Sequence, residues 1–306
     1  QLTHSGRYAK PEGVPAPLIA YNNPLFEKEQ PIDKSRIVSD DKLKRLEEAF
    51  GATALLAQEA GFDGADIKCC HRYLLSEMLS AFTRPGDYGG AFENRTRLLR
   101  NAIFAAKGAT SGEFLITSRV NLYDGFAYPY GFGVSPTGGL MPDLTEPKAL
   151  VTLLHEELRL PMLDFTIGNP YVNPHVNRPY DGGPYVPDEH PLEGVARMLG
   201  CIGQLKKAFP SLCVIGSGFS YLRQFSPYLA AGAVEQSVCD LAGFGRMAFA
   251  YPDFPRDTLY GEGFNARKTC IACGKCSALM RAGTVAGCVV RDGETYLPFY
   301  QAHCCV

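Results

Sequence analysis

Helical and strand-like hydrophobic patterns alternate along most of the chain. Between residues 43 and 61, apolar side chains recur every three or four positions and the segment ends in glycine, whereas residues 62–68 form a short, mostly apolar run. These patterns predict an amphipathic helix followed by a buried strand. The same succession returns four times, with predicted helices at 93–108, 146–160, 194–209 and 220–232 and predicted strands at 113–122, 161–169, 211–218 and 237–245. This alternation requires parallel strands joined by helical crossovers, which is an α/β fold.

Polar residues and glycines gather at the carboxyl ends of the predicted strands. They are Lys68 and His71, Arg119, Gly168 and Asn169, Gly216 and Gly218, and Gly245 and Arg246. A (β/α)8 barrel brings all its strand ends to one mouth and builds its active site there, whereas an open doubly wound sheet uses mainly one switch point. Because strand after strand carries such residues, the sequence favours a TIM barrel.

The stretch GFGRMA at 243–248 fits the G-x-G-x-x-A fingerprint of dinucleotide-binding sites. A true dinucleotide-binding unit continues into a second strand with an acidic residue at its end. Here PDFPRDTLYGEGF and a group of cysteines follow instead. We therefore interpret GFGRMA as a phosphate-binding glycine turn at the last barrel strand.

Composition and charge exclude several classes of protein. The 306 residues are 46% hydrophobic and 20% charged, with a net charge of −2, as in an ordinary globular protein. Basic residues are scattered, so we expect no nucleic-acid partner, and no apolar run is long enough to span a membrane. Most cysteines outside the C-terminal segment lie in apolar stretches typical of buried free thiols, which favours a reducing cytoplasm.

Four of the eleven cysteines crowd into CIACGKCSALMRAGTVAGC near the end of the sequence. Cys270, Cys273, Cys276 and Cys288 have the spacing C-x2-C-x2-C-x11-C. An iron–sulfur cluster needs four converging thiolates, and a tight triplet supplies three of them from one loop. Zinc sites more often pair two C-x2-C knuckles. The spacing therefore favours a [4Fe–4S] cluster, with zinc as the alternative.

Several motifs resemble those of the flavin-dependent old yellow enzyme family. They are QLTHSGR, AGFDGADIK followed by HRYLLSEMLS, DYGGAFENRTR and GFGRMAFAYPDFP. With the cysteine motif, the chain is similar to the branch that contains NADH:flavin oxidoreductases and 2,4-dienoyl-CoA reductase, although iron–sulfur relatives commonly have three residues between the second and third cysteines. In that family Q-L-x-H-x-G-R forms the third barrel strand.

The resemblance implies a division of the chain into two parts. Residues 1–255 are expected to form an FMN-binding (β/α) barrel that lacks its first two β/α units, and residues 256–306 a cysteine-rich C-terminal extension. A remainder of six units cannot close an eight-stranded barrel with the usual tilt and shear.

The resemblance also implies which residues bind FMN. Gln1 is expected to contact the pyrimidine edge of the flavin, and Arg119 to place its charge where negative charge gathers on reduction. The alternative for Arg119 is a surface salt bridge. The phosphate is expected to lie against a glycine-rich cradle that gives access to backbone N–H groups. The cradle consists of Gly216, Ser217, Gly218, Gly245 and Arg246.

Three further residues resemble the family's catalytic groups. Tyr73 corresponds to the proton donor, and His71 to the residue that binds the substrate's carbonyl oxygen. Many relatives carry an H-x-x-H or H-x-x-N pair, but this chain has Lys68 at the first position. The lysine is expected to bind an anionic substrate group or, alternatively, to contact FMN or a loop carboxylate. Substrate contacts are also expected from the loop 168–181, at Tyr171, His175 and Arg178.

The function implied by the resemblance is FMN-dependent reduction of an activated C=C bond in a small unsaturated carbonyl substrate. Electrons are expected from NAD(P)H, either directly or through the [4Fe–4S] cluster from a separate electron-donor protein. Two alternatives stay open: a flavin-dependent amine dehydrogenase, and a non-catalytic redox sensor or electron carrier.

Overall fold

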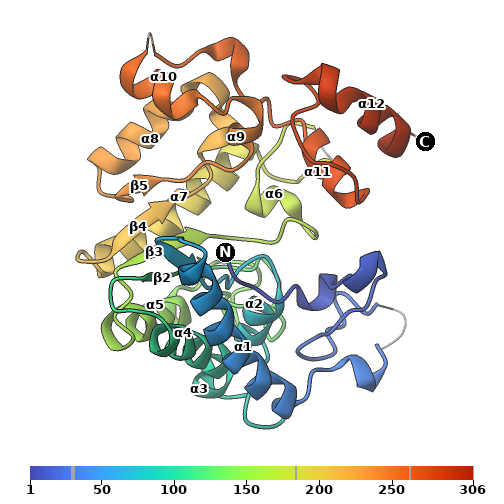
Figure 1. Cartoon of the computed structure of the whole chain (residues 1–306), viewed down its shortest axis with the longest axis vertical. Helices are drawn as coiled ribbons and strands as arrows, with labels where there is room; N and C mark the ends of the chain where they lie inside the picture. The colour runs from blue at the N-terminus through green and yellow to red at the C-terminus, as the bar shows by residue number, and fades with distance from the viewer. Residues whose placement is uncertain (29–31, 183–184, 262, 306) are drawn as a thin grey trace.

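Five parallel strands form the centre of the molecule (Figure 1). This computed structural model describes residues 1–28, 32–182, 185–261 and 263–305. The strands are β1 (Gly64–Asp66), β2 (Leu115–Asn121), β3 (Met162–Thr166), β4 (Cys213–Gly216) and β5 (Leu241–Ala242). Each pairs in parallel with the next, in chain order. The predicted parallel α/β fold is confirmed, while within the described residues no pairing joins β1 to β5 and the sheet stays open.

The first residues of the chain lie beside β1. Leu2 forms a parallel bridge with Ile67, and its N–H donates to the Asp66 carbonyl at 2.8 Å. The chain then turns into a 3-10 helix at Gly6–Tyr8. The segment expected to be a full barrel strand is thus reduced to one bridge at the sheet edge.

Helices follow each strand, with small departures from the predicted bounds. The longer helices are α1 (Asp40–Glu59), α4 (Arg97–Ala109), α5 (Thr145–Val151) with a π-helical continuation at Thr152–Glu157, α7 (Pro191–Ala208), α8 (Ser226–Glu235) and α12 (Gly293–Cys304). The shorter ones are α2 (Leu74–Leu79), α3 (Phe92–Arg95), α6 (Pro174–Asn177), α9 (Arg246–Ala250), α10 (Phe254–Tyr260) and α11 (Lys275–Arg281). Further 3-10 helices occur at Pro11–Gly13, Lys34–Arg36, Phe219–Phe225 and Ala266–Lys268.

Helices α1 and α4 pack against each other along their apolar faces. Leu43 and Phe50 on α1 and Leu98 on α4 are buried, as the helical periodicity predicts. Gly51 allows the close approach, because a Cβ there would lie 3.0 Å from the carbonyl oxygen of Ala105.

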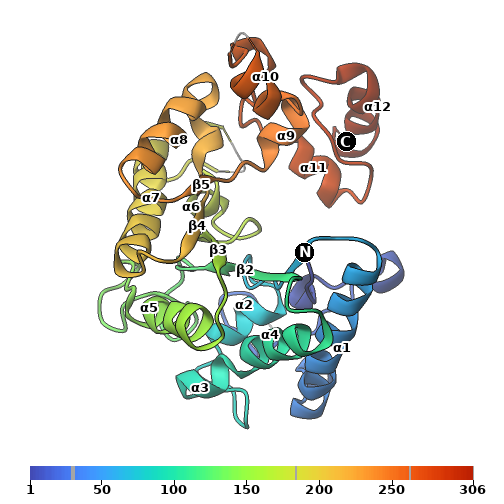
Figure 2. The same ribbon diagram turned by 60° about the vertical axis from the view of Figure 1, so that its left-hand side comes forward.

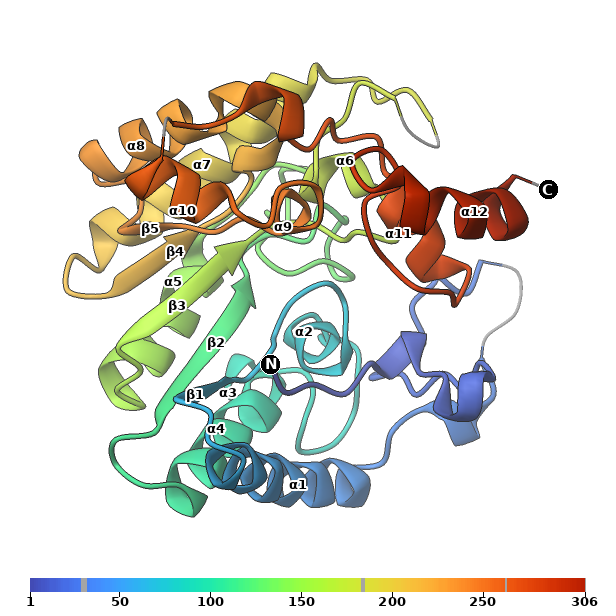
Figure 3. The same ribbon diagram turned by 45° about the horizontal axis from the view of Figure 1, so that its top comes forward.

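Two hydrophobic clusters hold the chain together. The larger runs through the sheet and its covering helices, and the smaller joins Met247, Ala250, Tyr251 and Cys270. Figure 2 places α9 to α12 at one end of the molecule, away from α1, α3, α4 and α5 at the other. In Figure 3 the arrows of β2 and β3 end on the side where α6 and α9 lie. Among the described helices, none combines the length and apolar character of a membrane span.

Candidate active site

The turn that follows β1 carries the candidate catalytic residues. His71 and Arg72 both have left-handed backbone conformations, with φ of 64° and 57°. Such conformations are strained for residues with a side chain and persist only where the surroundings impose them. Here the buried Arg72 side chain holds the turn in place. It forms an ion pair with Asp124 at 2.9 Å and a hydrogen bond to the Tyr130 carbonyl at 3.3 Å.

Tyr73, which precedes α2, lies in a group of three tyrosines. Its hydroxyl is 3.0 Å from the hydroxyl of Tyr171, which comes from the loop after β3. The ring of Tyr8 lies 4.0 Å from that of Tyr171 and 5.9 Å from that of Tyr73, between centroids. Asn169 fixes this group, because its side-chain amide donates to the Tyr8 hydroxyl at 3.3 Å and its carbonyl oxygen accepts from the Tyr171 N–H.

Lys68 and His71 are cationic candidates in an environment that disfavours positive charge. The Lys68 ammonium lies 3.3 Å from the ring centroid of Tyr73, a cation–π contact. Burial, and then the charge of Arg119, lower its pKa. Burial lowers the pKa of His71 well below its ordinary value, and the charges of Arg119 and Lys68 add to this effect. At neutral pH the imidazole is therefore uncharged, with an N–H to donate.

Arg119 forms an ion pair within the sheet rather than on the outer surface. It is the register partner of Asp164 on β3, and its Nε lies 3.1 Å from Asp164 Oδ2. Burial raises the pKa of Asp164 to about 6, although Arg119 opposes that rise. Gln1 lies beside the edge strand β1, where its side-chain amide donates to Asp66 at 2.9 Å.

The predicted glycine cradle lies at the ends of β4 and β5. Gly218 has φ of 103°, which favours glycine, and a Cβ there would lie 2.6 Å from the sulfur of Met198. Space is open at Gly245, where a Cβ would meet nothing within 4 Å. Ser217 differs from expectation, because its hydroxyl donates to the Phe165 carbonyl at 2.8 Å and points into the sheet. Only its backbone is thus free to face a ligand.

The four clustered cysteines line one small enclosed cavity of about 20 Å3. Arg246, Lys275 and Arg291 line it as well. The sulfur of Cys270 accepts from the N–H of Ala272, and that of Cys288 from the N–H of Arg291, each at 3.4 Å. Within the part of the chain that the structure describes, no group of three or more His, Cys, Asp or Glu side chains is arranged to hold a metal ion.

The loop between β3 and α7 sends its predicted substrate residues in different directions. Tyr171 reaches Tyr73, as described above. His175 instead bonds to the Tyr185 hydroxyl and lies 3.7 Å from Glu189. Arg178 turns toward the C-terminal segment and donates to the Ser277 hydroxyl at 2.7 Å.

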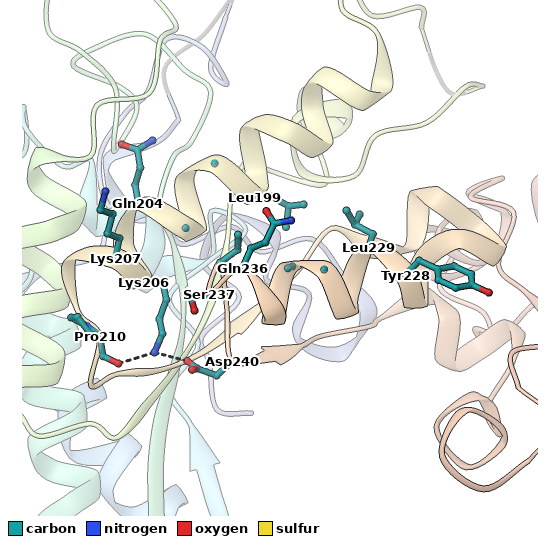
Figure 4. Close-up of a pocket in the computed structure, with 15 residues that line it drawn as sticks. Leu199, Gln204, Lys206, Lys207, Pro210, Tyr228, Leu229, Gln236, Ser237 and Asp240 are labelled. Atoms are coloured by element: carbon teal, nitrogen blue, oxygen red, sulfur yellow. Dashed lines mark hydrogen bonds and ion pairs between the residues drawn. The ribbon is translucent and has the colours of Figure 1, made fainter.

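A wide cavity of about 990 Å3 lies elsewhere, between α7 and α8 (Figure 4). In it, the Lys206 ammonium bridges the Pro210 carbonyl and the Asp240 carboxylate, at 2.9 and 2.8 Å. These contacts tie the end of α7 to the strands. None of the predicted site residues lines this cavity.

Sequence reasoning missed two residues of the site. The sequence does indicate Asp164, because a carboxylate in the apolar strand MLDFT needs a partner on a neighbouring strand. Arg119 on β2 is that partner. Tyr8 gives no such signal, since only the fold brings it to Tyr171.

Comparison with known proteins finds a family match over the first part of the chain. Residues 1–132 match the sequence model of the NADH:flavin oxidoreductase / NADH oxidase family. The chain is also similar to the NADPH dehydrogenase of Clostridium acetobutylicum, with 35% identity over 138 residues. That match covers 44% of this chain and 39% of the relative.

Two solved structures share the fold over nearly the whole chain. 2-Naphthoyl-CoA reductase superposes with a TM-score of 0.71 at 19% identity, covering 95% of this chain and 42% of that one. 6-Hydroxypseudooxynicotine amine oxidase from Pseudomonas geniculata gives 0.69 at 22% identity, covering 97% and 40%. The chain thus spans about two fifths of the length of these proteins.

Proposed function

Because residues 1–132 match the NADH:flavin oxidoreductase / NADH oxidase family, we propose that the protein is an FMN-dependent oxidoreductase that reduces an activated C=C bond of an unsaturated carbonyl compound. One observation carries this proposal. His71 and Tyr73 lie two residues apart in the turn after β1, where the Tyr73 hydroxyl is 3.0 Å from that of Tyr171 and the Lys68 ammonium lies over the Tyr73 ring.

The residues present fit an anionic, planar cofactor with a phosphate tail. The Arg119 side chain is 28% exposed, so it can reach a ligand as well as Asp164. Open space at Gly245 and the left-handed turn at Gly218 suit a backbone that closely approaches a phosphate. When bound, FMN supplies the hydride that the reduction requires.

The side chains of the turn after β1 have distinct roles in this reaction. The His71 N–H donates to the carbonyl oxygen of the substrate and stabilises the negative charge that develops there. Tyr73 donates its hydroxyl proton to the α-carbon, which completes the addition of a hydride and a proton across the double bond. Burial raises the pKa of Tyr73, followed by the hydrogen bond with Tyr171, so the phenol keeps this proton at neutral pH.

We propose that residues 256–306 bind a [4Fe–4S] cluster through Cys270, Cys273, Cys276 and Cys288. The shared cavity, the nearby cations and the N–H···S hydrogen bonds support this donor set. The spacing of three close cysteines and one distant one favours a cluster over zinc, whose sites more often pair two C-x2-C knuckles. The cluster would pass electrons from NAD(P)H or from a separate donor protein, in a reducing cytoplasm.

Amine oxidation is the second candidate. The group formed by Tyr8, Tyr73 and Tyr171 already holds the Lys68 ammonium against one ring. Aromatic faces of this kind also bind substrate ammonium groups. Turnover of amines without turnover of enones would favour this function.

The variant Tyr73→Phe tests the proposal. Reoxidation of the reduced flavin by 2-cyclohexenone, measured by stopped-flow absorbance, should slow about 100-fold or more, because positioned proton donors contribute roughly that factor. FMN content should stay unchanged. The control is Tyr228→Phe, whose side chain is exposed on α8. Equal rates in Tyr73→Phe and Tyr228→Phe would contradict the assigned role.

A further inference from the structure

A second cavity, of about 410 Å3, lies between the loop after β3 and the C-terminal segment. Its walls come from three elements that are distant in sequence: Arg178 after α6, Arg246 at the start of α9, and Lys275 and Arg281 on α11. Its volume is within the range of ordinary small-molecule sites. It belongs neither to the turn after β1 nor to the wide cavity of Figure 4.

The charges around this cavity all have the same sign. Four cations line it, and no Asp or Glu is among its described lining residues. Arg178 and Arg281 both donate to one acceptor, the Pro170 carbonyl, at 3.0 and 3.1 Å. These hydrogen bonds hold two guanidinium groups together although they repel each other.

The crowding has an electrostatic cost that an anion would remove. Burial, together with the charges of Arg246 and Arg281, lowers the pKa of Arg178 to about 10. Within the described part of the chain, none of the four cations forms an ion pair with a carboxylate. Guanidinium groups suit phosphate oxygens because they donate two parallel hydrogen bonds.

We propose that this cavity binds a phosphate or pyrophosphate group of a ligand other than the flavin. Arg178 and Arg281 line only this cavity, whereas Arg246 and Lys275 also line the cysteine cavity. The two paired guanidinium groups of Arg178 and Arg281 suit the oxygens of a phosphate group better than those of a single carboxylate. Arg178 also connects the cavity to the candidate active site, since it donates to the Pro170 carbonyl at 3.0 Å and the next residue, Tyr171, has its hydroxyl 3.0 Å from that of Tyr73. A ligand with its reactive end at His71 can therefore place a phosphorylated tail here.

Two sources share this chemistry: the nucleotide tail of an acyl thioester and that of a reduced nicotinamide dinucleotide. Assigning the tail to either one rests on the proposed function. The anion site itself does not, because its occupancy can be measured without flavin reduction or turnover.

The first experiment is calorimetric titration of the full chain with inorganic pyrophosphate. Binding should weaken about tenfold in Arg281→Gln and in Lys275→Gln, because each removes a charge-assisted contact. It should also weaken as salt is raised. Arg45→Gln, an exposed change on α1, is the matched control and should bind as the wild type does. Coenzyme A and NADPH are then tested as competitors.

Displacement of pyrophosphate by coenzyme A or by NADPH supports the proposal and identifies the source. Three results would overturn it: no binding by the wild type, equal binding by Arg281→Gln and Arg45→Gln, or displacement by neither competitor. Loss of bound FMN in Arg281→Gln, together with loss of pyrophosphate, would also overturn it, since the cavity would then hold the flavin phosphate. A chain that binds pyrophosphate but fails to reduce enones would refute only the proposed function.

Discussion

At the scale of single residues, the site depends on how Tyr73 keeps its proton. The Tyr171 hydroxyl lies 3.0 Å away, and this hydrogen bond raises the pKa of Tyr73 after the larger effect of burial. The proton donor should therefore stay protonated through the neutral and mildly alkaline range. Tyr171 acts on it from a different strand end, and so is a positioning residue.

Tyr171→Phe should lower the rate of enone reduction about three- to tenfold, because one hydrogen bond of about 1 kcal/mol is lost. The alkaline limb of the pH–rate profile should also move to lower pH, since the hydrogen bond no longer raises the pKa of Tyr73. Stopped-flow rates between neutral pH and pH 11 measure both effects. An unchanged alkaline limb would mean that Tyr171 does not act through Tyr73.

Asp164 should make stability depend on pH. Burial raises its pKa from 3.8 to about 6 in the folded state, so the folded protein binds this proton more tightly than the unfolded chain. The resulting stability is fully present below about pH 4 and is lost as the pH rises to about 6. Between about pH 4 and pH 6, the free energy of unfolding of the wild type should fall by at most about 3 kcal/mol relative to that of Asp164→Asn.

Urea unfolding of both proteins at several pH values measures this difference. Asp188→Asn, an exposed change, is the control and should follow the wild type. If the free energy of unfolding changed with pH equally in the wild type and Asp164→Asn, Asp164 would have an ordinary pKa.

At the scale of elements, the cysteine segment differs from the rest of the chain. It packs on α9 through the small cluster around Met247 and Cys270, and it contacts the loop after β3 through Arg178 and Arg281. It thus lies between α9, which follows β5, and the loop after β3. This position suits an electron relay better than a remote structural extension.

Cys273→Ser should remove most of the iron and the broad visible absorbance of the anaerobically purified protein, because a cluster needs four thiolates. Cys305→Ser is the matched control, since Cys305 is also exposed but lies outside the shared cavity. Iron and sulfide analysis of the two variants gives the answer. Equal iron content in both would remove Cys273 from the ligand set.

At the scale of the whole molecule, the hydrophobic pattern predicted the order of elements because parallel strands and crossover helices each have their own period. Every strand predicted from the hydrophobic pattern contains an observed one, although 237–245 shrinks to Leu241–Ala242. Local pattern did not reveal the break between α3 and α4 at Thr96, whose hydroxyl donates to the Phe92 carbonyl at 2.9 Å. Such breaks depend on single side-chain contacts rather than on periodicity.

The site was predictable to the extent that it lies at strand ends. Lys68, His71 and Arg119 meet because parallel strands bring their carboxyl ends to one side. Loops have no comparable period, so the sequence did not separate Tyr171, which joins the site, from Arg178, which leaves it for the C-terminal segment. The charged cavity at Arg178 is formed by three elements that are distant in sequence, so no local sequence pattern predicts it.

The most direct test of this account is the FMN, iron, sulfide and zinc content of the anaerobically purified chain. We predict one FMN with about four iron and four sulfide per chain, as expected for one [4Fe–4S] cluster. Zinc without sulfide would contradict the electron relay and make the cysteines structural. Absence of FMN under conditions where the chain is folded would contradict the oxidoreductase itself.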